Sequence, residues 1–346
     1  MATMKDIAEK SGYSIATVSR VLNQDASLAV TDATKEKIFQ VAQSLGYKTL
    51  RDKRSEKEAQ DPSRLTMGLV YYRTEEQELS DPYFLSIRLG VENKCARMGV
   101  TLEKIYREND NAALQIPSDV DGLIVVGRVS EGEIARLREV TGSLTFVDYP
   151  ADSRQYDAVV IDFAEAMEVV LAELTGLGHR SIGFIGGHRH FPPDEIVRDE
   201  REHAFRYYLD RRGLLDEALI YTGDFNTSEG YRLMTEALQA QNRPTAFFIA
   251  SDSMAIGAYR AAFEAGVRIP EDLSVVGFND ISASSYLQPS LSTVKVYTEF
   301  MGETAVDLAI ERIRTKREIP KKVVLPTEFI RRESLKERTQ SSRNKT

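Results

Sequence analysis

The sequence predicts a small all-α head followed by an α/β core of two doubly wound parallel sheets. Every periodic segment of residues 1–47 has helical spacing. Residues 48–64 then hold ten charged residues and almost no apolar side chain, which is the composition of a linker. From residue 66 onward, continuous apolar runs alternate with amphipathic helices, as in parallel sheets that helices cover on both faces.

The head sequence predicts three short helices in order. The first spans residues 4–11 and is ended by Gly12. Ser14 can cap a second helix that runs to Asn23, because a serine oxygen accepts a hydrogen bond from the first helical turn. A third helix, over residues 32–45, follows a threonine in the same capping position. Two helices joined by a turn that contains glycine indicate a helix-turn-helix, although an ordinary helical hairpin has the same spacing.

The core sequence predicts strands and helices in alternation. About ten strands fit two sheets better than one, and the cleft between two such sheets is a usual ligand position. The expected strands are 66–72, 101–106, 122–126, 143–148, 158–161, 182–185, 246–250, 273–278 and 293–296. The expected helices between them include 84–98, 163–177, 199–212, 227–240, 252–265 and 299–314.

Composition excludes several classes of protein. Hydrophobic content is 42% and charged content 28%, the balance of a globular protein. We expect no membrane partner, because no apolar run is long enough to span a bilayer and the start has no apolar signal core. The single cysteine, Cys95, excludes an internal disulfide framework and agrees with a cytoplasmic location. Four histidines leave little material for a structural zinc site, so we expect neither metal nor cofactor.

Charge is unevenly distributed along the chain. The 346 residues carry a formal net charge of −8. Residues 1–60 hold ten Lys/Arg against eight Asp/Glu, a net charge of +2, so the remaining residues carry −10. A near-neutral head on an acidic body suits a small DNA-facing module.

One face of the second predicted helix carries side chains suited to a DNA groove. Arg20 can bond both acceptors of a guanine edge, and the apolar Ile15 and Ala16 can contact a thymine methyl group. Thr17 and Ser19 can bond phosphate oxygens and so fix the register of the helix on the duplex. The alternative is the solvated face of an ordinary hairpin.

The head resembles that of the LacI/GalR family of bacterial transcription repressors. The resemblance is carried by DIA, SIATVSRVLN, TDATKEKI and LGY in the head. It continues through GLIVVG, GHRSIGFIGG, FIASDSMAIGAYRAAFEAG, GFND and LPTEFIRRES, and so covers nearly the whole chain. Within the family the chain is similar to the galactose and β-galactoside repressors, including that of the evolved β-galactosidase operon, through SIATVSRVLN, DPYFLSIRLGVE and QYDAVVIDFAEA.

The resemblance implies that the second helix reads an operator half-site. It gives base preference to Ile15, Ala16 and Arg20. It implies that four polar residues contact the DNA backbone or support the helix: Ser14, Thr17, Ser19 and Asn23. It also implies that Thr3 and Lys5, at the first helix, contact phosphates.

The linker departs from the family pattern. The family hinge usually reads P-x-x-x-A-R-x-L, whereas KTLRDKRSEKEAQ has neither that proline nor the A-R-x-L signature. Leu50 is the single large apolar residue in the segment, and Arg51 and Arg54 are among its basic residues. We therefore expect a flexible basic tether that meets the phosphate backbone, rather than a hinge helix.

The core resembles the periplasmic sugar-binding fold, and the resemblance implies a cleft that binds a sugar effector. Acidic and amide groups would bond sugar hydroxyls, and aromatic rings would form a wall. The implied effector residues are Tyr83, Phe84, Asp148, Arg201, Ser251, Asp252, Asn279 and Asp280. For each a purely structural role is the alternative: Asp252 can cap the helix 252–265, and Tyr83 and Phe84 can belong to the core.

These expectations define the boundaries of the parts. The expected DNA-binding head is 1–47, the linker 48–64, the core 65–338 and a polar tail 339–346. Within the core, the first subdomain is expected at about 65–160 and 290–318, and the second at about 161–289 and 319–338. A homodimer along the core is expected, through helix 84–98 and the strands near 273–285, to match a pseudo-palindromic operator.

The sequence thus predicts a repressor whose binding to operator DNA is modulated by a sugar, galactose or a β-galactoside. An enzyme is not expected, because neither G-x-G-x-x-G at a strand-to-helix turn nor a P-loop occurs, and His188 and His190 lack evident further metal ligands. The alternatives are a sugar-binding protein for transport and a regulator that acts as an activator or a corepressed repressor.

Overall fold

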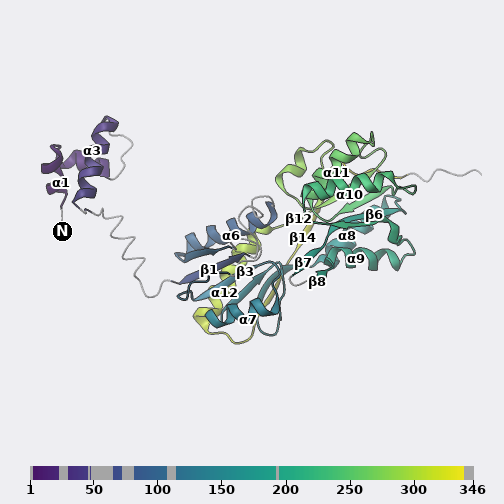
Figure 1. Cartoon of the computed structure of the whole chain (residues 1–346), viewed down its shortest axis with the longest axis horizontal. Coiled ribbons are helices and arrows are strands. Elements are labelled where there is room, and N and C mark those ends of the chain that lie inside the picture. The colour runs from purple at the N-terminus through teal and green to yellow at the C-terminus, as the bar shows by residue number, and fades with distance from the viewer. Residues whose placement is uncertain are drawn as a thin grey trace, which may run out of the picture. The chain divides into compact units, whose positions relative to one another are not determined.

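The computed structural model describes residues 3–22, 30–45, 47, 65–71, 82–106, 114–191 and 195–338. The chain forms two compact units, which divide between Arg64 and Leu65 (Figure 1). The linker 48–64 and the tail 339–346 lie outside the described residues. So do four of the predicted DNA-contact residues: Asn23, Leu50, Arg51 and Arg54.

Three helices form the described part of the head. Their shared core is small, and Ile7, Val18 and Ile38, one from each helix, are 0% exposed. Gly12 has a φ of 79°, a left-handed conformation that ends the first helix. The structure therefore confirms the predicted helix-turn-helix, with α1 (Met4–Ser11), α2 (Ile15–Leu22) and α3 (Asp32–Ser44).

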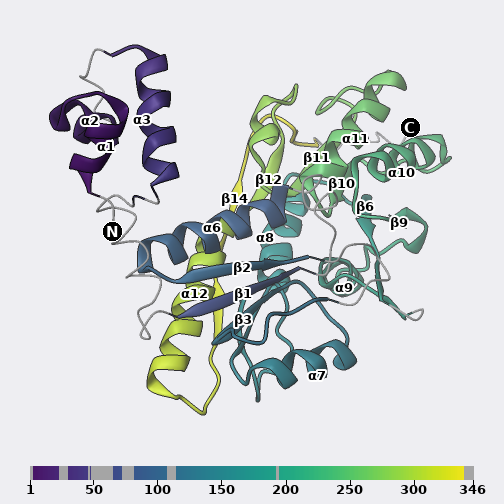
Figure 2. The ribbon, with the colours of Figure 1, turned by 60° about the vertical axis from the view of Figure 1, so that its left-hand side comes forward.

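The first sheet of the core has six strands in the order β13-β5-β4-β3-β1-β2, and all neighbouring pairs are parallel. Two helices pack together on one face and a third covers the other (Figure 2). A Cβ at Gly90 would lie 2.0 Å from the backbone oxygen of Glu299, so glycine permits the close approach of the paired helices. The strands are β1 (Thr66–Tyr71), β2 (Thr101–Ile105), β3 (Gly122–Val126), β4 (Leu144–Val147), β5 (Asp157–Ile161) and β13 (Lys322–Leu325); the paired helices are α6 (Pro82–Met98) and α12 (Thr298–Thr315), and the third is α7 (Glu131–Val140).

The second sheet also has six strands, in the order β14-β12-β11-β10-β6-β9. β14 pairs antiparallel with β12, and the other neighbouring pairs are parallel. The strands are β6 (Ile182–Gly187), β9 (Ile220–Gly223), β10 (Ala246–Ile249), β11 (Ser274–Asn279), β12 (Ser292–Val296) and β14 (Thr327–Ile330).

Helices cover both faces of this sheet as well, which confirms the predicted doubly wound architecture. One pair is α8 (Phe163–Gly176) with α9 (Glu200–Asp210), and the other is α10 (Thr227–Gln239) with α11 (Asp252–Glu264). The hairpin of β7 (Arg189–Phe191) and β8 (Glu195–Val197) precedes α9, and the 3-10 turns are η1 (Glu217–Leu219) and η2 (Ser282–Tyr286).

The chain passes between the two sheets three times, from β5 to α8, from β12 to α12 and from β13 to β14. The expected subdomain boundaries differ here from the structure. β12 pairs with β11 in the second sheet, although 290–318 was expected in the first subdomain. β13 pairs with β5 in the first sheet, although 319–338 was expected in the second. The reason is that each crossing falls immediately beside a strand, so the neighbouring helix does not reveal the sheet to which the strand belongs.

No helix in the described ranges combines the length and apolar character that a membrane span requires.

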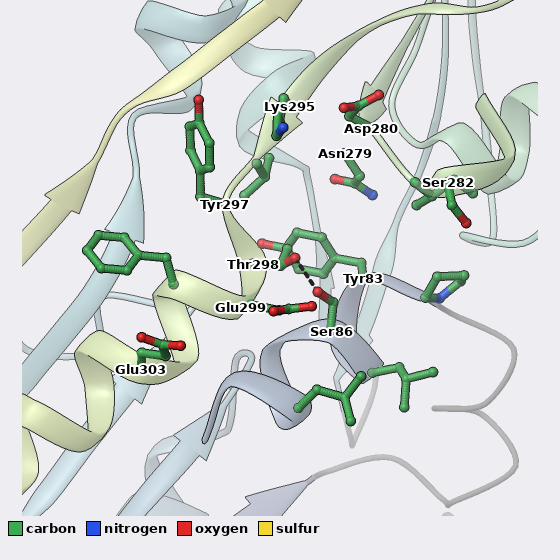
Figure 3. Close-up of a pocket in the computed structure, with 16 residues that line it drawn as sticks. Tyr83, Ser86, Asn279, Asp280, Ser282, Lys295, Tyr297, Thr298, Glu299 and Glu303 are labelled. Carbon is green, nitrogen blue, oxygen red and sulfur yellow. Dashed lines mark hydrogen bonds between the residues drawn. The ribbon is translucent and has the colours of Figure 1, made fainter. Parts of the chain in front are cut away.

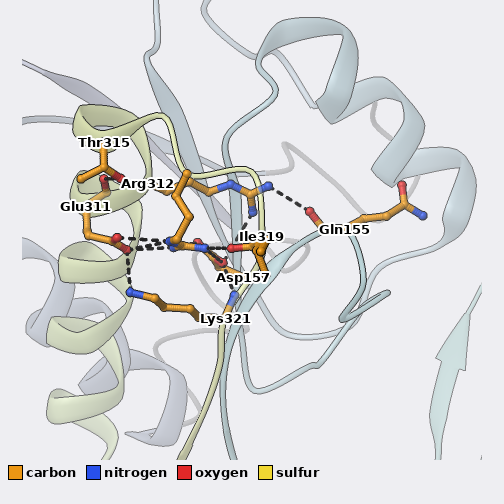
Figure 4. Close-up of polar contacts among 8 residues, drawn as sticks. Gln155, Asp157, Glu311, Arg312, Thr315, Ile319 and Lys321 are labelled. Carbon is orange, nitrogen blue, oxygen red and sulfur yellow. Dashed lines mark hydrogen bonds and ion pairs between the residues drawn. The ribbon is translucent and has the colours of Figure 1, made fainter.

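A buried ionic cluster closes the amino-terminal edge of the first sheet. Asp157, the first residue of β5, is 0% exposed. Its carboxylate accepts hydrogen bonds from Arg317 at 3.0 and 2.8 Å and from the Lys321 backbone N–H at 2.6 Å (Figure 4). Arg312 lies 3.6 Å from the same carboxylate and donates to the backbone oxygen of Gln155 at 3.1 Å. The cluster fixes the loop between α12 and β13 against β5.

We expect Asp157→Ala to lower the free energy of unfolding by about 3–5 kcal/mol, because it removes the buried carboxylate that two largely buried guanidinium groups share. Urea unfolding followed by far-UV circular dichroism measures this change. Glu318→Ala, at an exposed position of the same loop, is the control and should change it by no more than about 0.5 kcal/mol. A loss below about 1 kcal/mol for Asp157→Ala would show that the cluster behaves as a surface ion pair.

Candidate functional site

The second helix of the head presents an exposed face suited to a DNA groove. Ile15 is 49% exposed, and Ala16 and Arg20 are exposed beside it. The opposite face of α2, with Val18 and Val21, is buried against the rest of the head. An isolated helix has about the width that the major groove accepts, so this face can reach base edges.

Hydroxyl groups fix the start of this helix. The Ser14 Oγ accepts a hydrogen bond from the Thr17 backbone N–H at 3.1 Å and lies 2.9 Å from the Thr17 hydroxyl. Ser14 therefore has a capping role in addition to any role on DNA. Thr17 and Ser19 are half-buried, at the border between the exposed and buried faces. The structure thus places Ile15, Ala16 and Arg20 together as the outward group.

The first helix begins with a capping box. Thr3 accepts from the Asp6 backbone N–H at 3.3 Å, and the Asp6 carboxylate accepts from the Thr3 N–H at 2.7 Å. The hydrogen bonds from Thr3 lower the pKa of Asp6. Lys5 is exposed in the same turn. Thr3 therefore has a structural role, while Lys5 is available for a phosphate.

A pocket of about 600 Å³ lies in the core, beside the β12–α12 crossing (Figure 3). The amino-terminal end of α6 forms one side, and the turn after β11 forms another. This volume falls within the range of small-molecule sites. Its polar lining residues include Tyr83, Ser86, Asn279, Asp280, Lys295, Tyr297, Thr298 and Glu299.

Three of the predicted effector residues line this pocket, and a fourth contacts one of them. Tyr83, Asn279 and Asp280 are lining residues. The Tyr83 hydroxyl donates to the Asp148 carboxylate at 2.8 Å, and both residues are 8% exposed. Phe84 packs edge-on against Tyr83 and is not a lining residue of this pocket.

The turn after β11 is held in an unusual conformation. Asn279 has a φ of 111° and Asp280 a φ of 54°, in a region that favours glycine. Arg332 donates to the Asp280 carboxylate at 2.6 Å, and this ion pair holds the turn. Both residues line the pocket (Figure 3).

Arg201 lies apart from the lining of this pocket, in a cluster of its own. Its guanidinium makes two hydrogen bonds to the Asp199 carboxylate, at 2.6 and 2.7 Å, and a third to the backbone oxygen of Ala250. Three phenylalanine rings surround it at 5.1 to 5.2 Å. The rings belong to Phe163, Phe225 and Phe278, which sequence reasoning missed.

The signals for this cluster were weak in the sequence. Asp199 is the N-cap of α9 and accepts from the Arg201 N–H at 2.9 Å, so the D-x-R spacing is itself a recognisable pattern. A Cβ at Gly187 would lie 2.4 Å from the Phe225 ring, so that glycine makes room for the ring. The three rings come from distant segments, and no local pattern joins them.

Ser251 and Asp252 support the fold around the turn rather than line this pocket. Ser251 is the N-cap of α11 and accepts from the Met254 N–H at 3.2 Å. Asp252 is 0% exposed, and its carboxylate accepts three hydrogen bonds from the segments that follow the turn. The donors are the Ile281 N–H at 3.0 Å and the hydroxyls of Ser284 and Thr293, each at 2.7 Å.

Residues of the β12–α12 crossing complete the pocket, and the sequence reasoning did not include them. The Thr298 hydroxyl donates to the Ser86 hydroxyl at 2.6 Å and so ties α12 to α6 (Figure 3). The Tyr297 hydroxyl donates to Glu328 at 2.8 Å. Lys295 lies 5.4 Å from the Tyr297 ring. Lys295 lies on strand β12 of the second sheet, and Thr298 lies on α12, which covers the first sheet. The pocket is therefore lined by residues from both subdomains.

The chemistry of the pocket suits a neutral ligand rich in hydroxyl groups. The amide can donate to or accept from a hydroxyl, the carboxylates accept from hydroxyls, and tyrosine rings offer faces for apolar ring carbons. Within the described part of the chain there is no group of three or more His, Cys, Asp or Glu side chains that could hold a metal ion.

Asp252 gives stability a pH dependence of known sign. Burial raises its pKa from the ordinary 3.8 to about 6, against the lowering effect of its hydrogen bonds. The folded chain therefore binds this proton more tightly than the unfolded chain. The contribution of Asp252 to stability is full below pH 4 and is lost as the pH rises through about 6.

We expect the unfolding free energy of the wild type minus that of Asp252→Asn to fall over this pH window by on the order of 3 kcal/mol. Denaturant unfolding at each pH measures it, and a difference that is flat between pH 4 and 7 would contradict the assignment.

Two family models match the chain. The model for bacterial regulatory proteins of the lacI family matches residues 3–49, and that for a periplasmic binding protein-like domain matches residues 171–335. The HTH-type transcriptional regulator GanR of Bacillus subtilis (strain 168) is 38% identical, over 97% of this chain and 100% of GanR.

Solved structures share the fold. The complex of the transcriptional regulator CelR with cellobiose is 27% identical, has a TM-score of 0.68 and covers 96% of this chain and 100% of CelR. A lac repressor dimer bound to operator and the anti-inducer ONPF is 23% identical, with a TM-score of 0.69 over 97% of this chain and 99% of that chain. The head match, the shared fold and a full-length relative at 38% identity lead to one conclusion: the chain belongs to the lacI family of bacterial regulatory proteins.

Proposed function

We propose that the protein is a dimeric, sequence-specific transcriptional repressor whose operator binding is changed by a sugar, galactose or a β-galactoside. The observation that carries this proposal is the exposed group of Ile15, Ala16 and Arg20 on a helix fixed by its caps. An apolar pair followed by one arginine is suited to base edges rather than to general phosphate binding. The protein acts in the cytoplasm, on its operator DNA.

The pocket supports a sugar as the effector. Tyr83 and Tyr297 supply rings, and Asn279, Asp280 and Glu299 supply amide and carboxylate oxygens. A pocket of about 600 Å³ accommodates a monosaccharide or a disaccharide. CelR, a relative of the same fold, was solved with cellobiose, which is a disaccharide. Galactose or a β-galactoside is favoured by the sequence likeness to galactoside repressors.

The charges in the pocket disfavour a sugar phosphate. Among its described lining residues, Asp280, Glu299 and Glu303 are acidic, and Lys295 is the cation. Arg332 pairs with Asp280, and Arg97 pairs with Glu303. Among the described lining residues, Glu299 is therefore the acid without such a pair, and Lys295 is the one cation for a phosphate. Free sugars therefore fit better than phosphorylated ones.

A dimer is supported by exposed apolar side chains in the part of the core that holds the pocket. Tyr286 is 85% exposed, Phe300 56% and Leu89 39%. Phe300 and Leu89 line the pocket, and Tyr286 ends the η2 turn that follows Asp280. The lac repressor was solved as a dimer on its operator. One small head buries too little surface for specific DNA binding. A dimer supplies two heads, one for each half-site of the operator.

A ligand screen tests the proposal. Purified protein is heated with free sugars, β-galactosides and sugar phosphates, and operator duplexes are selected from a random pool. A galactoside that raises the melting temperature and weakens operator binding is the expected result. A ligand that strengthens binding would identify a corepressed regulator instead. Sugar binding without recovery of any operator would favour a sugar-binding transport protein and overturn the repressor.

Arg20→Ala should lose about 1–3 kcal/mol of binding to the selected operator, while binding to random duplex DNA changes little. The reason is that a base-reading arginine contributes to specificity, whereas phosphate contacts are the same on every sequence. Fluorescence anisotropy on both duplexes measures the two affinities. Lys5→Ala is the control and should weaken both equally. Equal loss on both duplexes for Arg20→Ala would exclude a base-reading role.

Tyr83→Phe should weaken sugar binding roughly 5- to 30-fold, because it removes a hydroxyl in the pocket and leaves the buried Asp148 carboxylate without that donor. Titration calorimetry with the best sugar of the screen measures this, and operator affinity without sugar should be unchanged. Tyr207→Phe, on the exposed surface of α9, is the matched control. Unchanged sugar affinity in Tyr83→Phe would place the effector elsewhere.

A further inference from the structure

A basic segment lies at the end of α12 and in the loop that follows. Residues 311–322, ERIRTKREIPKK, hold six basic and two acidic side chains in a chain of net charge −8. The acidic residues are Glu311 and Glu318. This concentration of positive charge on an acidic core needs an explanation.

Three of the six basic residues have a structural role, and one of them, Lys321, pairs with Glu311 through its Nζ at 3.2 Å. Arg317 binds the buried Asp157 through two hydrogen bonds, and its Nε donates to Glu311 at 2.9 Å. Arg312 lies 3.6 Å from the Asp157 carboxylate (Figure 4). These contacts, with the hydrogen bond from the Lys321 N–H to Asp157, hold the loop in one conformation.

The three other basic residues lie in the last turn of α12, at its C-cap and at the start of β13. Arg314, Lys316 and Lys322 are exposed, and within the described chain they make no side-chain hydrogen bond and no ion pair. Lys316 has a φ of 54° and ends α12, so the chain turns sharply there. The carboxyl end of a helix favours a cation, which accounts for Arg314, but Lys316 and Lys322 lie beyond the last turn.

The loop lies at the edge of the first sheet where the chain enters the core. Because the first sheet is parallel, the amino ends of β13 and β1 lie at the same edge. The chain enters the core at Leu65, directly before β1. β13 and β1 are four strand steps apart, about 19 Å at the usual strand spacing. The basic loop therefore lies on the edge of the core from which the chain leads to the head.

We infer that Arg314, Lys316 and Lys322 form a second DNA contact, which binds the phosphate backbone of the duplex that the head holds. The inference rests on the proposed DNA-binding function. The contact is independent of base sequence, because exposed lysine and arginine side chains of this kind bind phosphate charge and displace counterions. It adds affinity to the small contact surface of the heads.

The test compares two triple variants of the full chain. Arg314→Gln/Lys316→Gln/Lys322→Gln removes the proposed contact. Arg211→Gln/Arg243→Gln/Lys336→Gln makes the same charge change at exposed positions of the second subdomain. Affinity for an operator recovered by selection, and for a random duplex of about 40 base pairs, is measured from low to high salt. Melting temperature and sugar affinity verify that both variants are folded.

The expected result is a slope of log affinity against log salt that is shallower by about 2 to 3 in the first variant, equally on both duplexes. The control variant should keep the wild-type slope. An unchanged slope in the first variant, or an equal change in both variants, would overturn the second contact while operator binding by the head stands. A wild-type protein that binds neither duplex would overturn the proposed function, and this inference with it.

Discussion

The two sheets of the core are joined by three chain crossings, and the rest of the structure depends on this constraint. Each crossing is short, so the two sheets are held close together. The β12–α12 crossing carries pocket residues on both of its sides, Lys295 on one sheet and Thr298 on the other. A ligand in this pocket therefore contacts both subdomains at a point where the chain crosses between them. The chain toward the head leaves from the first of these sheets, at Leu65.

Local patterns predicted most of the fold. Helical periodicity and a glycine turn identified the head, and apolar strands between amphipathic helices identified the doubly wound sheets. The expectation failed where strands are short and partly exposed. β13 and β14 are four residues long, carry exposed residues such as Lys322 and Glu328, and lie at the edges of their sheets. Which sheet a strand joins is set by pairing with strands that are distant in the sequence. Local patterns therefore could not predict that β12 belongs to the second sheet and β13 to the first.

The pocket was predictable in part for the same reason. Tyr83 and the Asn279–Asp280 turn were found from their motifs, and the structure brings them to one pocket. The burial of Asp252 by three donors from separate segments has no local signal, and the aromatic surroundings of Arg201 have none either. A polar residue in a family motif can thus serve the ligand or hold the loop that serves it, and only tertiary contacts separate the two.

The central claim is that sugar in the core and operator on the head are linked, and reciprocity tests it most directly. Sugar affinity is measured by calorimetry with and without saturating operator, and operator affinity with and without saturating sugar. We expect the two affinities to change by the same factor, because linkage between two binding sites is symmetric. Sugar binding that is identical with and without operator would contradict it, and would leave the core and the head as independent binding units.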